Sequence, residues 1–180
     1  MSRGFKKEEA PEDPIVVPPR APLPVGVPNY VTPRGERLLR EERAALTEER
    51  SRLAGLVGEM EEIRRKREVA AVAERLANLQ ARLSRTQVVD PSRQTRQGDH
   101  GSGEVVRFGA HVVLSAADGS ERPFQIVGVD EADAASGRVA FTSPIARAVT
   151  GKRVGDVARL QTASGEETLV VLSVRYGDAA

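Results

Sequence analysis

Three glutamates and an apolar residue form a short acidic stretch near the middle of the first half of the chain. The glutamates are Glu59, Glu61 and Glu62, interrupted by Met60. Carboxylate oxygens are hard ligands that hold Mg²⁺ and orient a water molecule, which Met60 and the following Ile63 cannot do. The stretch therefore supplies candidate oxygen ligands, with Glu61 and Glu62 as the main candidates and Glu59 as the weaker one. The alternative is a solvent-exposed helix turn, because glutamate is common on protein surfaces.

Four cations follow this acidic stretch directly, as Arg64, Arg65, Lys66 and Arg67. Consecutive residues of a helix point in all directions, so the run must cover several faces. Lysine and arginine bind phosphate groups through charge and hydrogen bonds, so one interpretation is a clamp on a nucleic-acid backbone. The other is an exposed basic turn without a ligand.

Two amphipathic helices are expected to position these side chains. Apolar residues recur every seven positions before the acidic stretch and step by three and four after it. The positions are Leu39, Leu46, Leu53 and Met60 in the first arm and Val69, Val72, Leu76, Leu79 and Leu83 in the second. This spacing keeps one seam toward a partner helix and predicts an antiparallel coiled coil. Pairing Leu39 with Leu83 places the turn near Glu61.

The composition favours two small units and excludes several classes of function. Aromatic residues make up 3% of the 180 residues, which argues against one large core. The 27 basic and 26 acidic side chains leave a net charge of +1, so any contact with nucleic acid must be local. The absence of cysteine removes disulfides, thiolate metal sites and cysteine nucleophiles. His100 and His111 have no ligand spacing and are not site candidates.

The sequence contains no predicted membrane segment. No apolar run approaches the roughly 20 residues that cross a bilayer, and the N-terminus lacks the apolar stretch of a signal peptide. We therefore expect a cytoplasmic protein that does not contact membranes.

The chain divides into four predicted segments. Residues 1–30 hold seven of the eleven prolines and are expected to be extended or disordered, without helix or sheet ladders. Residues 31–90 form the coiled coil, with Thr32 as N-cap, Pro33 as first helical residue and the second helix ending near Ser84. Residues 91–103 are polar and form a linker. Residues 104–180 form a small β-rich domain, which makes the chain α+β.

Within the predicted β domain the apolar period changes to two. Strands are expected at 105–108, 111–114, 124–129, 138–142, 157–162 and 167–176, with a hairpin turn at Ser164 and Gly165. Ser143 caps a short helix that Gly151 closes.

Several motifs resemble the bacterial GreA/GreB transcript cleavage factors. They are Phe108-Gly109-Ala110, Ile126-Val127-Gly128-Val129-Asp130-Glu131-Ala132-Asp133, Ser143-Pro144-Ile145-Ala146-Arg147-Ala148 and Gly151-Lys152-Arg153-Val154-Gly155-Asp156. Upstream, Thr32-Pro33-Arg34-Gly35 and the stretch from Ala81 to Asp90 are also similar. The similarity covers roughly residues 30 to 176, and the proline-rich arm lies outside it.

The resemblance implies a mode of action. In this family an FKBP-like domain without isomerase chemistry docks at the rim of the RNA polymerase secondary channel, and the coiled coil enters the channel. The tip carboxylates then help to hold a second Mg²⁺ and a water, and the polymerase hydrolyses the backtracked RNA. By this resemblance the chain is a monomer and not itself an enzyme, holds no metal stably alone, and shares Mg²⁺ with the polymerase. Its partners are RNA polymerase and the nascent RNA 3′ end, which the basic run would contact.

The chain departs from the family pattern in two respects. The usual tip has an Asp next to a Gly, two residues before a Lys or Arg and three before a Glu, whereas this chain reads Gly58-Glu59-Met60-Glu61-Glu62. The segment from Thr32 to Asp90 is also about ten residues shorter than the family norm, or roughly five per arm, which removes ~7–8 Å of reach at about 1.5 Å per residue. A non-catalytic regulator that occupies the channel and competes with cleavage factors is therefore the alternative function.

A second set of residues is expected to dock on the polymerase. By resemblance these are Asp130, Glu131, Asp133, Ser143, Pro144 and Arg147. From the residues alone, the three acids are expected to accept hydrogen bonds from backbone amides in a turn, and Ser143 to cap a helix.

Overall fold

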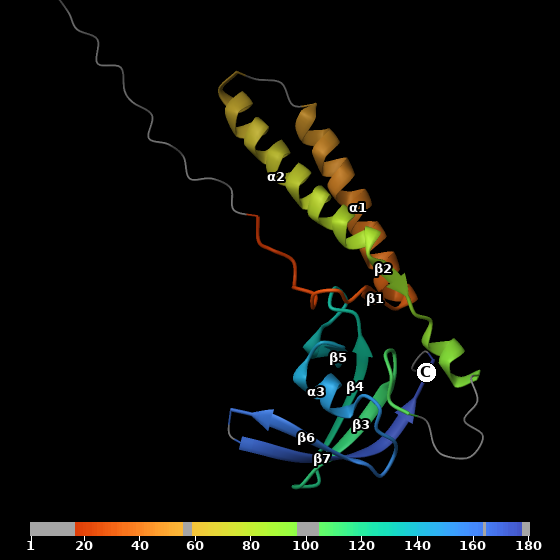
Figure 1. Ribbon diagram of the computed structural model, residues 1–180. Coiled ribbons are helices and arrows are strands. Elements are labelled where there is room, and N and C mark those ends of the chain that lie inside the picture. Colours follow the sequence, from red (N-terminus) through yellow and green to blue (C-terminus); the bar gives the residue numbers. More distant parts are fainter. Residues whose placement is uncertain (1–16, 56–58, 97–104, 164, 178–180) are drawn as a thin grey trace, which may run out of the picture.

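The computed structural model describes residues 17–55, 59–96, 105–163 and 165–177, which form a long helical hairpin and a small β domain (Figure 1). Residues 1–16 of the proline-rich arm, residues 97–103 of the expected linker, His100 and Ser164 lie outside the described residues.

The hairpin consists of helix α1 over Pro33–Ala54 and helix α2 over Glu59–Ser84. The hydroxyl of Thr32 accepts a hydrogen bond from the Gly35 N–H at 3.2 Å, and Pro33 suits the first turn because that position needs no N–H donor. The predicted N-cap and the predicted end of the second helix are both confirmed. The two helices lie side by side and run in opposite directions (Figure 1).

One apolar seam holds the two helices together. Its buried residues are Val31, Leu39, Leu46, Leu53, Val72 and Leu79, with Val69, Leu76 and Leu83 packed against them. All of them except Val31 are positions that the apolar spacing predicted, so the seam is confirmed for the described residues, and the Met60 side chain lies outside them. Burying each leucine side chain contributes about 1.5–3 kcal/mol, which makes the seam the main stabilising feature of the hairpin.

Two short strands join the base of the hairpin. Strand β1, Asn29–Val31, precedes α1, and strand β2, Thr86–Val88, follows α2. The strands are parallel, with Asn29 opposite Thr86. Our expectation that residues 1–30 could not join a β ladder was therefore wrong at the end of that segment. The last proline is Pro28, so the residues after it keep the N–H groups that a ladder needs.

The β domain is built on a mixed sheet with strand order β5-β4-β3-β7-β6. The strands are β3 His111–Ala116, β4 Glu121–Val127, β5 Arg138–Ala140, β6 Val157–Thr162 and β7 Gly165–Arg175. Strand β5 is parallel to β4, and the other pairs are antiparallel. The predicted α+β class, with helices first and a β domain second, is confirmed.

The core of this domain lies between the sheet and helix α3, Pro144–Val149 (Figure 1). Alternate strand residues enter it, as the two-residue period predicted. Its buried members include Val112, Leu114, Phe124, Ile126, Ala146, Val149, Leu169 and Val171. No described residue belongs both to this core and to the hairpin seam.

Two details differ from the sequence predictions. Residues 105–108 do not form a strand: the Val106 N–H donates to the Lys152 carbonyl at 2.8 Å, so this segment pairs with the loop after α3 instead of with the sheet. The linker expected at 91–103 begins with a 3₁₀ helix, Pro91–Arg96. Pro91 is buried against Gly109, where an added Cβ would lie 2.5 Å from the proline ring.

Candidate functional site

The acidic stretch lies in the first turn of α2 and not in the connecting turn, where we predicted it. Helix α1 ends at Ala54, and the Gly55 N–H caps it by bonding to the Ser51 and Arg52 carbonyls, each at 3.2 Å. Helix α2 begins at Glu59, after residues 56–58, which lie outside the described residues. The prediction assumed arms of equal length, whereas α1 has 22 residues and α2 has 26.

The start of a helix suits acidic residues. The N-terminal end of the macrodipole carries partial positive charge, so Glu59, Glu61 and Glu62 favour helix formation there. Positions 59 and 62 are three apart and share one side of the helix, whereas positions 61 and 62 are turned by about 100°. Positions 59 and 62 therefore have the spacing of the two acids in the tip pattern of the family that the motifs resemble. The Glu59 and Glu61 side chains lie outside what the structure describes, so Glu61 and Glu62 as the main candidates remain a prediction.

Glu62 is paired within its own helix. The Lys66 ammonium lies 2.6 Å from the Glu62 Oε1, and both side chains are largely exposed. The hydrogen bond from Lys66, and next its positive charge, hold the pKa of Glu62 below its ordinary value of 4.5. Glu62 is therefore ionised in neutral solution and ready to accept a cation, but Lys66 must move before a metal ion can take its place.

The basic run surrounds α2 just beyond the acidic turn. Arg64 pairs with Glu68, with Nε 3.1 Å from Oε1, and the Arg64 side chain is 81% exposed. Arg65 and Arg67 are half-buried and also have partners. The run therefore combines internal pairing with a large exposed cationic surface, and phosphate groups would have to exchange with the glutamate partners.

No group of three or more His, Asp or Glu side chains gathers into a metal site among the described residues. The tip carboxylates fit Mg²⁺ chemistry as oxygen ligands, but they form only part of a coordination set. What this arrangement can do is complete a metal site whose other ligands come from another molecule.

The predicted docking residues divide between surface and interior. Ser143 caps α3 by accepting a hydrogen bond from the Ala146 N–H at 3.2 Å, as predicted. Pro144 and Arg147 are exposed on the same short helix. Asp133 is also accessible, and its pKa is lowered, first by a hydrogen bond from the Ser136 hydroxyl. These four residues remain available to a partner.

Asp130 and Glu131 are not available in the same way. Glu131 is 4% exposed and accepts hydrogen bonds from the Thr32 N–H at 2.9 Å, the Thr32 hydroxyl at 2.6 Å and the Gly128 N–H at 2.9 Å. Glu131 therefore satisfies a backbone amide of its own turn, as predicted, but also joins the β domain to the start of α1. Asp130 has a side chain that is 8% exposed and is paired with two arginines. The geometry does not support a docking role for either carboxylate.

Comparisons with known proteins identify the family. A family model described as "Transcription elongation factor, GreA/GreB, C-term" matches residues 101–176. A transcription elongation factor GreA of Alkalilimnicola ehrlichii is 39% identical over 158 residues, which cover 81% of this chain and 96% of that relative. The chain belongs to the GreA/GreB family.

A second relative agrees with this GreA/GreB assignment. A GreA of Beijerinckia indica is 36% identical over 158 residues, with the same coverage of both chains. Among solved structures, GreA factor homolog 1 of Thermus thermophilus is 23% identical and covers 83% of this chain and 99% of its own, with a TM-score of 0.38. In the described part of this GreA/GreB-family chain, no helix is long and apolar enough to span a membrane.

The junction between the hairpin and the β domain of this GreA/GreB-family protein contains contacts that sequence reasoning missed. The rings of Tyr30, Phe108 and Phe141 contact one another with centroids 5.8–6.1 Å apart, and they join β1 to the β domain. Arg20 and Arg82 also lie at this junction and reach the same carboxylate, that of Asp130. A single arginine among prolines gave no periodic signal, so Arg20 could not be singled out from the sequence.

Proposed function

We propose that this chain binds RNA polymerase through its β domain and assists cleavage of backtracked RNA with the carboxylates at the start of α2. The observation that carries the proposal is that the start of α2, which carries Glu59, Glu61 and the ionised Glu62, lies at the far end of the hairpin, away from the β domain (Figure 1). Family membership supports the elongation role, and a remote acidic tip supports delivery of ligands to a metal site in a larger partner.

In this mechanism the chain supplies groups and the polymerase performs the hydrolysis. Glu59 and Glu62 share one side of α2 and would add oxygen ligands to a Mg²⁺ that the polymerase holds in part. Glu61 would orient the attacking water from the neighbouring side of the helix. Lys66 would release Glu62 as the ion approaches, and it would then lie beside the RNA phosphates with the other cations of the run.

A second candidate function is a non-catalytic regulator that occupies the secondary channel. The ion pair between Lys66 and Glu62 favours it, because a carboxylate that is already paired with an ammonium group must lose that partner before it can bind a metal ion. The short hairpin favours it too, since α1 at 22 residues is only about 33 Å long.

One experiment distinguishes the two functions. Stalled elongation complexes with labelled RNA are mixed with the parent chain, with the Glu61→Gln/Glu62→Gln variant and with Glu59→Gln. We expect the parent to shorten the RNA 3′ end and the double variant to bind polymerase without shortening it. A matched control is Glu48→Gln/Glu74→Gln, which removes two exposed carboxylates from the shaft of the hairpin.

The outcomes separate clearly. Cleavage by the double variant at the parent's rate would remove Glu61 and Glu62 from the mechanism. A parent that binds but never shortens RNA, even at saturating Mg²⁺, and that blocks an active cleavage factor, would establish the channel-occupying function. A parent that does not bind polymerase would contradict both.

A further inference from the structure

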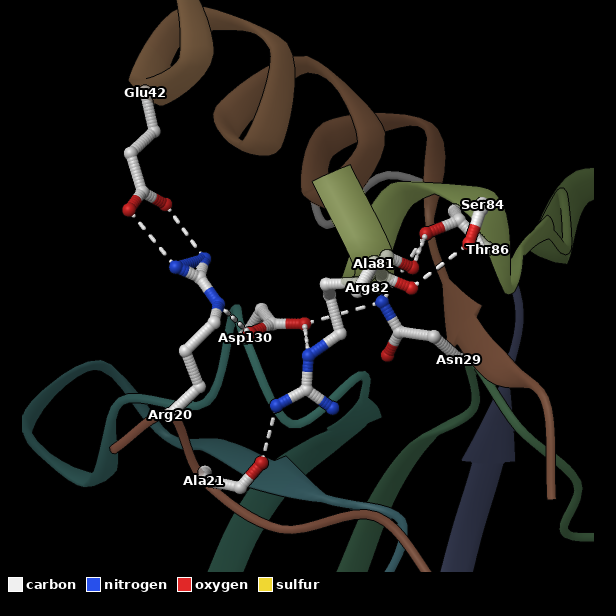
Figure 2. Close-up of polar contacts among 9 residues, drawn as sticks. All are labelled: Arg20, Ala21, Asn29, Glu42, Ala81, Arg82, Ser84, Thr86 and Asp130. Carbon is white, nitrogen blue, oxygen red and sulfur yellow. Dashed lines mark hydrogen bonds and ion pairs between the residues drawn. The ribbon is translucent and has the colours of Figure 1, made fainter. Parts of the chain in front are cut away.

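The proline-rich segment at residues 17–28, which we call the strap, contacts the hairpin through one arginine. The Arg20 guanidinium donates two parallel hydrogen bonds to Glu42 of α1, at 2.8 Å to Oε1 and 2.7 Å to Oε2 (Figure 2). Paired bonds between a planar guanidinium and a carboxylate fix direction as well as distance. Arg20 therefore holds the strap against a defined point of α1.

The same arginine also reaches the β domain. Its Nε lies 3.6 Å from the Asp130 Oδ1, an ion pair beyond hydrogen-bond range. Arg82 of α2 approaches the other oxygen of Asp130, with 3.4 Å between Nε and Oδ2, and Asn29 donates to that oxygen at 3.1 Å. Figure 2 shows the Asp130 carboxylate between the two guanidinium groups. One carboxylate of the β domain thus receives a cation from the strap and a cation from the hairpin.

The strap backbone is attached to α2 and to the residue after it. The Arg82 guanidinium donates to the Ala21 carbonyl, and Arg85 donates to the Val27 carbonyl at 3.2 Å. These contacts hold the strap at Ala21 and at Val27, on either side of Pro22 and Pro24, so its path along the hairpin is set by arginine side chains.

Polar contacts, and not apolar burial, attach the strap. None of its side chains from residue 17 to residue 28 is buried, and Val25 is fully exposed. A cavity of about 310 Å³ lies between Pro19–Leu23 and the facing residues of α2. A segment held by charges over an incompletely filled surface can detach without unfolding the rest of the chain.

The strap contacts α1 at Glu42, which lies well away from the base of the hairpin. The other contacts between hairpin and β domain lie at the base of the hairpin: from Thr32 to Glu131, from Arg82 to Asp130, and among Tyr30, Phe108 and Phe141. Glu42 is ten residues beyond Thr32 and so about 15 Å further along the helix. A contact at that height restrains tilting of the hairpin much better than a contact at the pivot.

We propose that the strap fixes the angle between the hairpin and the β domain, and that Arg20 is the positioning residue that fastens it. Among the described strap residues, Arg20 is the side chain that contacts both α1 and the β domain. A tilt of 10° over a hairpin about 35 Å long moves its tip by about 6 Å. Functional groups must be held within about 0.5 Å, so the angle decides whether the tip reaches its target. The effect on RNA cleavage rests on the proposed function, but the fixing of the angle does not.

The angle can be measured directly in the full chain, because it contains no cysteine. Spin labels are placed at Ala54→Cys, the last residue of α1, and at Ala117→Cys, in an exposed turn of the β domain. Pulsed electron paramagnetic resonance then gives the distribution of distances between the labels. We expect one narrow distribution for the parent, and a broader one with a second population for Arg20→Gln.

A matched control and a salt series test the cause. Arg43→Gln removes an exposed charge from α1 beside Glu42 and should leave the distribution narrow. About 1 M salt shortens the Debye length to about 3 Å, so the parent should broaden toward the Arg20→Gln distribution. Circular dichroism verifies that each variant keeps its helix content, and the salt series on the parent remains decisive if a variant fails to fold. The proposal would be overturned if the distance distribution of the parent were the same at low and high salt and the same as that of Arg20→Gln. It would also be overturned if Arg43→Gln broadened the distribution as much as Arg20→Gln.

A cleavage assay separates this proposal from the proposed function. With stalled elongation complexes, Arg20→Gln should lower the maximal cleavage rate several-fold and leave the half-saturating concentration unchanged, because the docking face is intact. If Arg20→Gln and high salt change the label distances but even the parent gives no cleavage, the strap proposal is supported and the proposed cleavage function fails. If the parent cleaves but neither Arg20→Gln nor high salt changes the label distances, only the strap proposal fails.

Discussion

A single buried carboxylate, that of Glu131, joins the two halves of this molecule. It receives hydrogen bonds from the N-cap residue Thr32 and from its own turn at Gly128. A carboxylate has only acceptors to offer, and all three of its partners are donors. The site is therefore matched to a charged acid, and a surface role for Glu131 is incompatible with 4% exposure.

We predict that Glu131→Gln destabilises the protein by about 2–3 kcal/mol, because hydrogen bonds to a charged group are lost and the new amide turns a donor toward donors. Urea unfolding followed by circular dichroism measures this difference. Asp133→Asn is the control, since its carboxylate is exposed in the same loop and should contribute much less to stability. Equal losses in the two variants would contradict the importance that we give to the buried site.

The tip pair gives a prediction about pH. Because Lys66 keeps the pKa of Glu62 below its unfolded value, the pair stabilises the folded state above that value, and the stabilisation is lost as the pH falls through the folded pKa. Lys66→Met should raise the pKa of Glu62 toward 4.5 and reduce the loss of stability in acid. Carbon NMR titration of the glutamate carboxyl measures the shift.

An internal reference is available for that titration. The pKa of Asp118 is lowered mainly by hydrogen bonds from Ser120, in a turn of the β domain, so it should be the same in parent and Lys66→Met. A Glu62 pKa that does not move would show that Lys66 is not its partner in solution.

At the scale of elements, the hairpin and the β domain approach so closely that glycine is required between them. A Cβ on Gly128 would lie 2.5 Å from the Tyr30 carbonyl of β1. A Cβ on Gly35, in the first turn of α1, would lie 2.7 Å from the Glu131 carboxyl carbon. Both glycines permit one element to rest on the backbone or on the fixed side chain of another.

We predict that Gly128→Ala lowers the free energy of unfolding by about 1–3 kcal/mol, because β1 must move away from the turn after β4. The comparison variant is Gly55→Ala, where the nearest atoms lie at 3.6 Å in ordinary contact, and it should be close to neutral. Thermal unfolding measures both. A neutral Gly128→Ala would mean that the strand can shift without cost.

The basic run gives a second prediction at this scale. Replacing Arg64, Arg65, Lys66 and Arg67 by alanine removes pairs worth about 0.2–0.5 kcal/mol each, so the helix should persist. If the run contacts RNA, crosslinking to the RNA 3′ end should weaken, and its dependence on salt should become shallower. An unchanged salt slope would indicate an exposed basic turn without a ligand.

The spacing of apolar residues predicted most of the elements, whereas the contacts between the elements were not predicted. Heptad leucines such as Leu46 and alternating strand residues such as Leu114 report burial through their spacing, so the seam and most strands were predicted. The position of the turn was not predicted correctly, because helices of unequal length can have the same heptad pattern as helices of equal length. The junction of Arg20, Asp130 and Arg82 joins residues 48 or more positions apart through ion pairs, and ion pairs between distant residues leave no periodic pattern in the sequence.

At the scale of the whole molecule, two cores meet at a polar and aromatic junction. The core of the β domain draws all its buried residues from positions 106 to 174, and the hairpin seam draws its own from positions 31 to 79. Helix α3, which carries the exposed docking candidates, packs on the first core. The tip lies on the hairpin, which the second core holds together. We therefore expect an isolated β domain to keep polymerase binding and to lose assistance to RNA cleavage.

We predict that residues 105–180 alone fold cooperatively and bind polymerase but do not promote RNA cleavage. Folding is expected because the buried residues of this core come from within the fragment, although the loss of Tyr30 uncovers Phe108 and Phe141 and should lower the melting temperature. Circular dichroism melting tests the fold, and competition with the intact chain for polymerase tests binding. A Pro144→Ala/Arg147→Ala fragment is the control and should compete poorly. A folded fragment that does not compete would place the polymerase contacts in the hairpin and would overturn this division of roles.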